Sequence, residues 1–261
     1  MKILLTNDDG INAGGIKALF NTFKTSHEVY IIAPESEKSA CSNAITVRTQ
    51  INIKRVAENQ FSVSGFPADC VIIGLSGDFI PDVDLIIAGI NHGPNVGDDL
   101  IFSGTVAGAR TAYIFGKPAI AISIDSFHRE SKYFNDAAEF LLGFVQDISQ
   151  HIVEHAQQAL KHNGQPLAPP PFYNINYPDL PVEQIKGKKF TRIGRRLYRD
   201  SFQSTIFNSD MATVQMGGYI ESVFSEGTDT TELEKGYISI SPLMTDSTNY
   251  EHFKHTEGND R

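Results

Sequence analysis

The sequence predicts an α/β protein: a Rossmann-like three-layer sandwich with a mainly parallel sheet, extended at its C-terminal end by a β-ribbon and tail. Through the first half, short apolar runs typical of buried strands alternate with helical patterns. Such alternation indicates a parallel sheet covered on both faces. From Gly187 onward, polar alternating stretches indicate an antiparallel ribbon. We therefore divide a single domain into an α/β core at residues 1–185 and a C-terminal extension at residues 186–261.

Composition narrows the class of protein. The 261 residues are 41% hydrophobic, which is enough for one large core. The net charge of −9 argues against general binding of nucleic-acid polymers or anionic membranes. No apolar run reaches the roughly 18 residues of a membrane helix, and the N-terminus lacks a signal-peptide pattern. We expect a cytoplasmic protein in which Cys41 and Cys70 are reduced, buried small hydrophobes.

The first predicted strand begins at Lys2 and ends abruptly at Asn7-Asp8-Asp9-Gly10. Neighbouring side chains of a strand point to opposite faces, so the two acids can serve one site only where the strand has ended. Gly10 allows a sharp turn in which both carboxylates converge. A proton or a hard divalent cation between them would relieve their repulsion. On this stretch alone, a turn in which one Asp caps the next helix is an equally good interpretation.

The next elements continue the alternation. Apolar residues at helical spacing predict a helix after Gly14-Gly15 (Ile16, Leu19, Phe20 and Phe23). Pro34 ends a second strand over 29–33, and the segment 35–47 is predicted to be a loop that carries Ser39. Extended segments are predicted over 48–64, followed by a helix from Pro67 to about Leu75, since Pro suits a first helical position.

A buried strand over 84–88 ends in the glycine-rich polar sequence 89–99, which contains Asn91 and Asn95. Ser103-Gly104-Thr105 then opens a helix of small residues that ends near Gly116, and a strand follows over 118–124. The start of that helix, with its N–H groups and two hydroxyls, can bind an anion. The alternative is a simple N-cap. We favour the anion site because the same loop carries both asparagines.

Several of these polar residues are expected to lie at one edge of the sheet. Ligands of parallel α/β sheets bind beyond the carboxyl ends of the strands. Asp8, Ser39 and Asn91 each follow a predicted strand. The sequence therefore predicts that all three lie on the same edge.

Two later patterns have simple structural interpretations. A helix is predicted over 135–161, and strands over 172–177 and 236–242. The sequence His151-Ile152-Val153-Glu154-His155 matches an inverted zinc-protease pattern. We interpret its histidines as part of a solvated polar stripe opposite a core face (stripe His151, His155, Gln158 and His162; core face Ile152, Ala156, Ala159 and Leu160). The basic run over 186–199 favours a solvated hairpin or subunit contact over a nucleotide site.

Taken together, the motifs resemble those of the survival protein SurE family of nucleotidases across about the whole chain. They are Asn7-Asp8-Asp9-Gly10-Ile11, Ala33-Pro34-Glu35 with Ser39, Gly89-Ile90-Asn91 with Asn95 and Asp98-Asp99, Ser103-Gly104-Thr105-Val106, Asn176 to Asp179, Thr191-Arg192 with Gly194-Arg195-Arg196, and Gly227-Thr228-Asp229. This resemblance implies a metal-dependent phosphatase of nucleoside 5′- and 3′-monophosphates, for which short polyphosphate can be a second substrate. It also implies a C-terminal region that reaches a neighbouring subunit, hence a homodimer or homotetramer.

The resemblance places one divalent cation, Mg²⁺ or Mn²⁺, on Asp8, Asp9, Ser39 and Asn91. Asp8 and Asp9 would be the catalytic acids. Such a cation can polarise a phosphoryl group and lower the pKa of a bound water. Because the two acids are adjacent rather than separated by one residue, we favour water over Asp8 as the nucleophile.

The phosphoryl oxygens would be held by four residues, for which the helix start supplies most of the donors (Asn95, Ser103, Gly104 and Thr105). Pro34-Glu35-Ser36 stands where many relatives have Pro-Asp-Arg, and the missing positive charge bears on substrate preference.

Two other classes of protein share some of these features. A signalling receiver domain also places acids after its first strand, but it needs an Asp where this chain has Asn91 and a Lys after its last strand, whereas Lys117 precedes one. A non-catalytic nucleotide-binding module is the second alternative. Turnover of a phosphate ester would exclude both.

Overall fold

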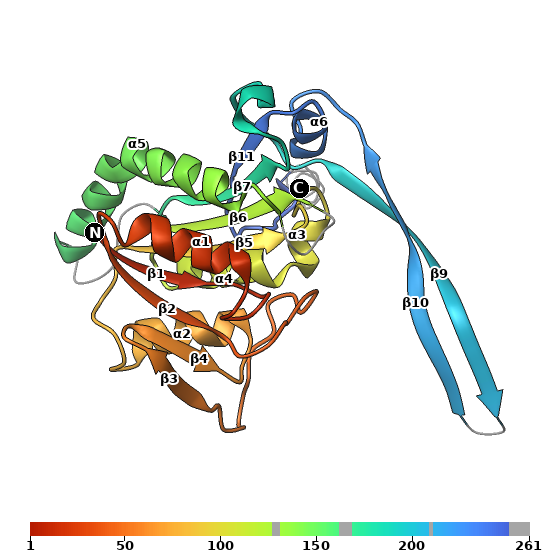
Figure 1. The fold of residues 1–261 in the computed structure, drawn as a ribbon, viewed down its shortest axis with the longest axis horizontal. Coiled ribbons are helices and arrows are strands. Elements are labelled where there is room, and N and C mark those ends of the chain that lie inside the picture. Colours follow the sequence, from red (N-terminus) through yellow and green to blue (C-terminus); the bar gives the residue numbers. More distant parts are fainter. Residues whose placement is uncertain (127–130, 162–168, 209–210, 251–261) are drawn as a thin grey trace, which may run out of the picture.

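The fold is a three-layer α/β sandwich from which one β-ribbon projects, as the sequence predicts (Figure 1). The computed structural model describes residues 1–126, 131–161, 169–208 and 211–250. Helices α1 (Gly14–Phe23) and α5 (Phe134–Lys161) cover one face of the sheet, and α2 (Pro67–Ser76) and α4 (Gly104–Ile114) cover the other. In this part of the chain, no helix is both long and apolar enough to cross a membrane.

The main sheet has nine strands among the described residues, in the order β3-β4-β2-β1-β5-β6-β7-β11-β8. Its strands are β1 (Lys2–Thr6), β2 (Glu28–Pro34), β3 (Ile53–Ala57), β4 (Gln60–Val63), β5 (Leu85–His92), β6 (Ala119–Asp125), β7 (Phe172–Pro178), β8 (Lys188–Phe190) and β11 (Ile238–Pro242). All neighbours are parallel except β3 with β4 and β7 with β11. The sheet is therefore mainly parallel, and its central strands end at one edge.

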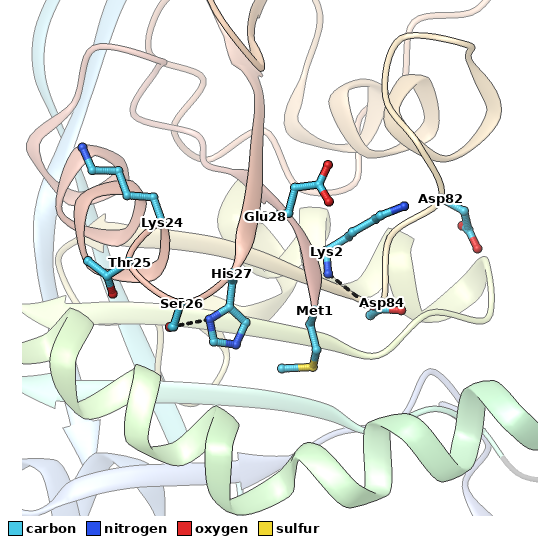
Figure 2. Close-up of a pocket in the computed structure, with 9 residues that line it drawn as sticks. All are labelled: Met1, Lys2, Lys24, Thr25, Ser26, His27, Glu28, Asp82 and Asp84. Carbon is cyan, nitrogen blue, oxygen red and sulfur yellow. Dashed lines mark hydrogen bonds between the residues drawn. The ribbon is translucent and has the colours of Figure 1, made fainter.

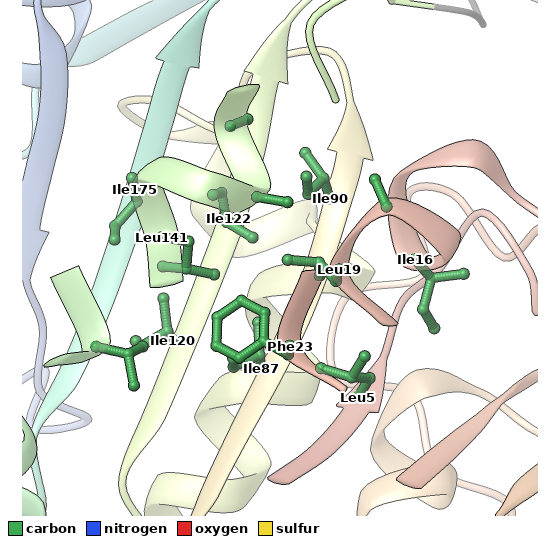
Figure 3. Close-up of a cluster of buried hydrophobic side chains, with 14 of the residues drawn as sticks. Leu5, Ile16, Leu19, Phe23, Ile87, Ile90, Ile120, Ile122, Leu141 and Ile175 are labelled. Carbon is green, nitrogen blue, oxygen red and sulfur yellow. The ribbon is translucent and has the colours of Figure 1, made fainter. Parts of the chain in front are cut away.

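Side chains of the central strands alternate between two cores. In β1, Ile3 and Leu5 face the layer of α1 and α5, while Leu4 faces the layer of α2 and α4. Figure 3 shows the first core, where Leu19 and Phe23 of α1 meet the strands. Because both faces of the central strands are buried, β1, β2 and β5 are largely continuous apolar runs, and their polar residues gather where these strands end.

The C-terminal extension contributes to the main sheet and also forms the ribbon. Strands β8 and β11 lie beyond residue 186 and pair within the main sheet. Strands β9 (Arg195–Asn208) and β10 (Met211–Val223) form the antiparallel ribbon, which extends away from the body (Figure 1). Helix α6 (Asp229–Glu234) follows it, and short helices are found at α3 (Asp99–Phe102) and Val182–Gln184. Of the polar tail, residues 251–261 lie outside the described residues.

The polar stripe predicted on α5 is wrong at two positions. His155 is buried, with Nε2 3.2 Å from the Gly116 carbonyl oxygen at the end of α4, whereas Ala156 is exposed. The carbonyl gives the imidazole a polar partner, so a histidine can face inward here. His151 and Glu154 are exposed, so the zinc-protease pattern does not share one face. His162 lies outside the described residues.

The two cysteines also differ from one another. Cys70 is buried in the core between β1 and α2, as predicted. Cys41 is only partly buried, so the prediction is wrong for this residue. It lies in the loop over 35–47, beside the position where Gly104 approaches Asp8.

Candidate active site

The turn after β1 presents the two acids at the carboxyl edge of the sheet. Asn7 Nδ2 donates to the Gly10 carbonyl at 2.9 Å, and the Ile11 N–H donates to the Pro34 carbonyl at 2.8 Å. Gly10 has a φ of +97°, which glycine adopts without strain. The turn therefore closes tightly against the end of β2, and Asp8 is left only 3% exposed.

Thr105 at the start of α4 holds the buried Asp8. Its Oγ1 donates to Asp8 Oδ1 at 2.5 Å, and its N–H donates to Asp8 Oδ2 at 3.1 Å. A Cβ added at Gly104 would lie 2.9 Å from Asp8 Oδ2, so only glycine allows the helix start to come this close. The positive end of the helix dipole adds to these bonds. Thr105 thus donates one hydrogen bond to each oxygen of the Asp8 carboxylate.

The end of β5 completes the cluster. Asn91 Nδ2 donates to the carbonyls of His92 and Gly93 at 3.1 and 2.8 Å, which turns its Oδ1 towards the Thr105 hydroxyl, 3.4 Å away. His92 Nδ1 lies 2.9 Å from Asp9 Oδ1. Asp8, Asp9 and Asn91 are therefore brought to one edge as predicted, by β1 and its neighbour β5.

The electrostatics of the acid pair favour a proton or a cation. Burial and, to a smaller extent, the charge of Asp9 together raise the pKa of Asp8 from 3.8 to about 6, although the bonds from Thr105 oppose both effects. A divalent cation beside the pair would reverse the effect of Asp9 by supplying opposite charge. The repulsion expected from the sequence is thus a property of the folded site.

The donor set suits a hard cation. Asp8 and Asp9 offer carboxylate oxygens and Asn91 offers an amide oxygen, which are ligands that Mg²⁺ and Mn²⁺ accept. Among the described residues, no group of three His, Cys, Asp or Glu could hold a metal ion. The acids and the Asn91 amide supply oxygen donors, and hydroxyl or water ligands would complete such a set.

Ser39 lies near this cluster, but its hydroxyl is directed elsewhere. The loop over 35–47 is anchored to the acid turn because the Lys38 N–H donates to the Asp8 carbonyl at 2.6 Å. Ser39 is exposed, and its Oγ donates to Glu37 Oε1 at 2.8 Å. The backbone therefore brings Ser39 to the site without placing its oxygen among the other ligands.

The residues predicted to bind phosphate make protein contacts. Ser103 Oγ accepts from the Val106 N–H at 3.0 Å, which is the N-cap interpretation. Thr105 donates to Asp8, and Gly104 allows the close approach. Asn95 is buried: its N–H donates to Asn176 Oδ1 at 2.8 Å and its Nδ2 to Ser123 Oγ at 2.8 Å.

Two features of the site were not anticipated from the sequence. The contact of His92 with Asp9 depends on the length of β5, which was predicted to end at Ala88 but continues to His92. The contact of Thr105 with Asp8 joins positions 97 residues apart. A cue for His92 existed, since it follows Asn91 directly at a strand end.

A separate hollow lies around the start of β1 (Figure 2), whereas the acid pair follows the end of that strand. It measures about 730 Å³ and is lined by the N-terminus, the α1–β2 turn and the loop before β5. Its carboxylates already have partners: Asp84 accepts the Lys2 N–H, Glu28 accepts the Tyr30 hydroxyl, and Asp82 pairs with Lys117. The hollow is thus distant from the acid pair and lacks its chemistry.

Comparison with known proteins gives one consistent result. The model of the family "Survival protein SurE" matches residues 3–200. The 5′-nucleotidase SurE of Marinomonas sp. (strain MWYL1) is 37% identical over 252 residues, covering 96% of this chain and 94% of the relative. That of Polaromonas naphthalenivorans (strain CJ2) is 38% identical over 253 residues with the same coverage. The crystal structure of the SurE protein from Aquifex aeolicus superposes with a TM-score of 0.79 at 30% identity, covering 100% of both chains.

Proposed function

This chain belongs to the survival protein SurE family, and from that premise we propose that it is a metal-dependent nucleotidase that releases phosphate from nucleoside 5′-monophosphates. Relatives named 5′-nucleotidase SurE match almost the whole chain, which supports the enzyme class. The observation that supports the metal dependence is the Asp8–Asp9 pair, in which Asp8 is buried and bound by the Thr105 hydroxyl, 3.4 Å from the Asn91 amide oxygen.

Asp8, Asp9, Asn91 and Ser39 would hold the cation, Mg²⁺ or Mn²⁺, which when bound polarises a phosphoryl group and lowers the pKa of water. Asp8 and Asp9 act as anionic ligands. Ser39 joins the set when its hydroxyl turns from Glu37, because the loop backbone is already fixed to Asp8.

Water, not Asp8, attacks the phosphorus. Both oxygens of Asp8 accept hydrogen bonds from Thr105, and these bonds orient the carboxylate and weaken it as a nucleophile. The Thr105 and Val106 N–H groups are bound to Asp8 and Ser103, so the start of α4 stabilises the charge that develops on the phosphoryl oxygens through the positive end of its helix dipole. Asn95 supports this edge by anchoring its loop to β7, where Asn174 and Asn176 both donate to its carbonyl.

The wider substrate range follows from the same site. Hydrolysis requires only the phosphoryl group to reach the acids, so 3′-monophosphates and short polyphosphate are further substrates. In this chain Ser36 leaves the loop over 35–47 without an arginine, and the Nζ of its lysine, Lys38, lies 5.5 Å from the centre of the Phe66 ring. The enzyme works in the cytoplasm as a homodimer or homotetramer built with the ribbon.

The decisive experiment is turnover of p-nitrophenyl phosphate by purified protein with Mn²⁺, followed by a panel of nucleoside monophosphates. We expect turnover that EDTA abolishes and that added Mn²⁺ or Mg²⁺ restores. A receiver domain or a non-catalytic nucleotide-binding module would give no sustained turnover. Full activity after exhaustive chelation would contradict the metal dependence.

A further inference from the structure

Three sequence motifs that the acid site does not use meet at the root of the ribbon. They are the end of the glycine-rich loop (97–99), the start of β9 (194–198) and Asp229 at the start of α6. Gly97, with a φ of +57°, packs directly on the backbone of Gly194 and Arg195, since an added Cβ would meet their atoms at 3.2–3.3 Å. The body and the ribbon are therefore in backbone contact here.

Asp229 ties the two segments together. Its Oδ2 accepts from the Gly97 N–H at 2.9 Å and its Oδ1 from the Gly194 N–H at 2.7 Å. The residue is completely buried, and burial raises the pKa of its carboxyl. Its two oxygens thus bridge the loop and the start of β9 from inside the protein.

Two residues of β9 bind the side chain of Asp99, the first residue of α3. Arg196 Nη1 lies 2.9 Å from Asp99 Oδ2, and both side chains are about nine-tenths buried at 13% and 14% exposure. The Tyr198 hydroxyl donates to Asp99 Oδ1 at 2.6 Å, and its ring lies edge-on to Phe102, with centroids 5.6 Å apart. A paired, buried carboxylate of this kind holds its helix in one place.

Helix α3 passes this constraint to the acid site by two routes. The Ser103 N–H donates to the Asp99 carbonyl at 3.0 Å, directly before the Gly104–Thr105 start of α4 that holds Asp8. The Ser42 N–H and Oγ donate to the carbonyls of Phe102 and Ile101 at 2.8 and 2.7 Å, which fixes the loop that carries Ser39.

We propose that Asp99, Arg196 and Tyr198 are positioning residues for the nucleotidase reaction. Their contacts hold α3 against the start of β9. Because α3 leads directly into α4, they also set the distance between the start of α4 and Asp8. The inference rests on the proposed function for its catalytic consequence, although the mechanical link is independent of it. A displaced ribbon root would move the Thr105 donors and the Ser39 loop together.

The test compares Tyr198→Phe and Asp99→Asn with Arg199→Gln, whose exposed ion pair with Glu221 lies wholly within the ribbon. We expect Tyr198→Phe to lower kcat about tenfold with KM little changed, because one hydrogen bond to a buried carboxylate is lost. Amide hydrogen exchange over residues 99–108 should become faster in Tyr198→Phe and stay unchanged in Arg199→Gln.

A double mutant separates positioning from general destabilisation. If Tyr198 acts through the start of α4, combining Tyr198→Phe with Thr105→Ala should lower kcat no further than Thr105→Ala alone. Losses that multiply, or a lowered Tm with wild-type kcat, would overturn the inference. Should the wild type itself lack turnover, the proposed function fails, and unchanged exchange over 99–108 in Tyr198→Phe would still overturn the mechanical link.

Discussion

At the scale of single residues, the unusual feature is an aspartate that folding makes costly to ionise. Asp8 has its pKa raised from 3.8 to about 6, chiefly by burial. In the metal-free protein the native state therefore keeps a proton between about pH 4 and 6 that the unfolded chain has released. Asp8 favours stability below pH 4, and this contribution is lost as the pH rises through 6.

Asp8→Asn should therefore stabilise the metal-free protein at pH 7. We expect about 1–3 kcal/mol, which corresponds to the pKa shift of roughly two units less the hydrogen bonds that Asn makes poorly. The gain should vanish near pH 4. Urea unfolding of EDTA-treated wild type and variant at both pH values measures it. With Mn²⁺ added, only the wild type should gain stability, and equal responses of the two proteins would contradict the metal site.

The same pKa predicts how metal affinity depends on pH. Binding requires an ionised carboxylate, so a cation competes with a proton at Asp8. Below about pH 6, the affinity for Mn²⁺ should fall roughly tenfold per pH unit, and above pH 7 it should be flat with respect to this group. Titration calorimetry between pH 5 and 8 provides the measurement. An affinity that does not change from pH 7 to pH 5 would show that Asp8 is not a ligand.

Sequence reasoning could identify Asp8, Asp9 and Asn91 together because each follows a predicted strand, and parallel strands end at one edge. It could not supply the side-chain directions. Ser39 points to Glu37 and Thr105 to Asp8, since those contacts depend on how two loops meet in space. The local sequence also does not indicate that Asn95 donates its hydrogen bonds to Ser123 of β6 and Asn176 of β7.

At the scale of elements, the close approach of α4 to β1 depends on Gly104. A Cβ there would meet Cys41 Sγ at 2.7 Å and Asp8 Oδ2 at 2.9 Å, so the helix start must move away. We expect Gly104→Ala to lower kcat about a hundredfold by displacing the donors that face Asp8, and Gly104→Val to be worse. Steady-state turnover with Mn²⁺ measures the loss.

A matched control is available in α5. Gly143 is an exposed helical glycine with nothing within 4 Å of an added Cβ. Gly143→Ala should raise stability by about 0.5–1 kcal/mol through helix propensity and leave turnover unchanged. Equal kinetics in the Gly104→Ala and Gly143→Ala variants would show that the approach of α4 has no catalytic role.

Elements themselves were predictable where hydrophobic periodicity was strong. The buried strands β1, β2, β5 and β6 are continuous apolar runs, and α5 has one apolar stripe. The predicted polar stripe was wrong at His155 because the Gly116 carbonyl, which follows α4, gives this buried imidazole a polar partner. The position of β11 between β7 and β8 could not be predicted from the sequence, since strands that pair from distant parts of the chain leave no local pattern.

At the scale of the whole molecule, the ribbon is the feature that a single chain explains least. It extends from the body into solvent (Figure 1), and several of its large apolar side chains are exposed (Met211, Val214, Tyr219, Ile220 and Val223). A long two-stranded ribbon is marginally stable on its own in water. Exposed large apolar side chains along an extended ribbon are typical of a surface that another subunit covers.

We therefore expect light scattering at micromolar concentration to give a mass at least twice the 28.8 kDa of one chain. Ile220→Asp should shift the protein towards monomer, because a charge buried in an apolar contact without a partner is costly. Glu221→Gln is the control, since its ion pair with Arg199 is half-exposed and contributes about 1 kcal/mol or less. A wild-type protein that is monomeric at these concentrations would contradict the assembly.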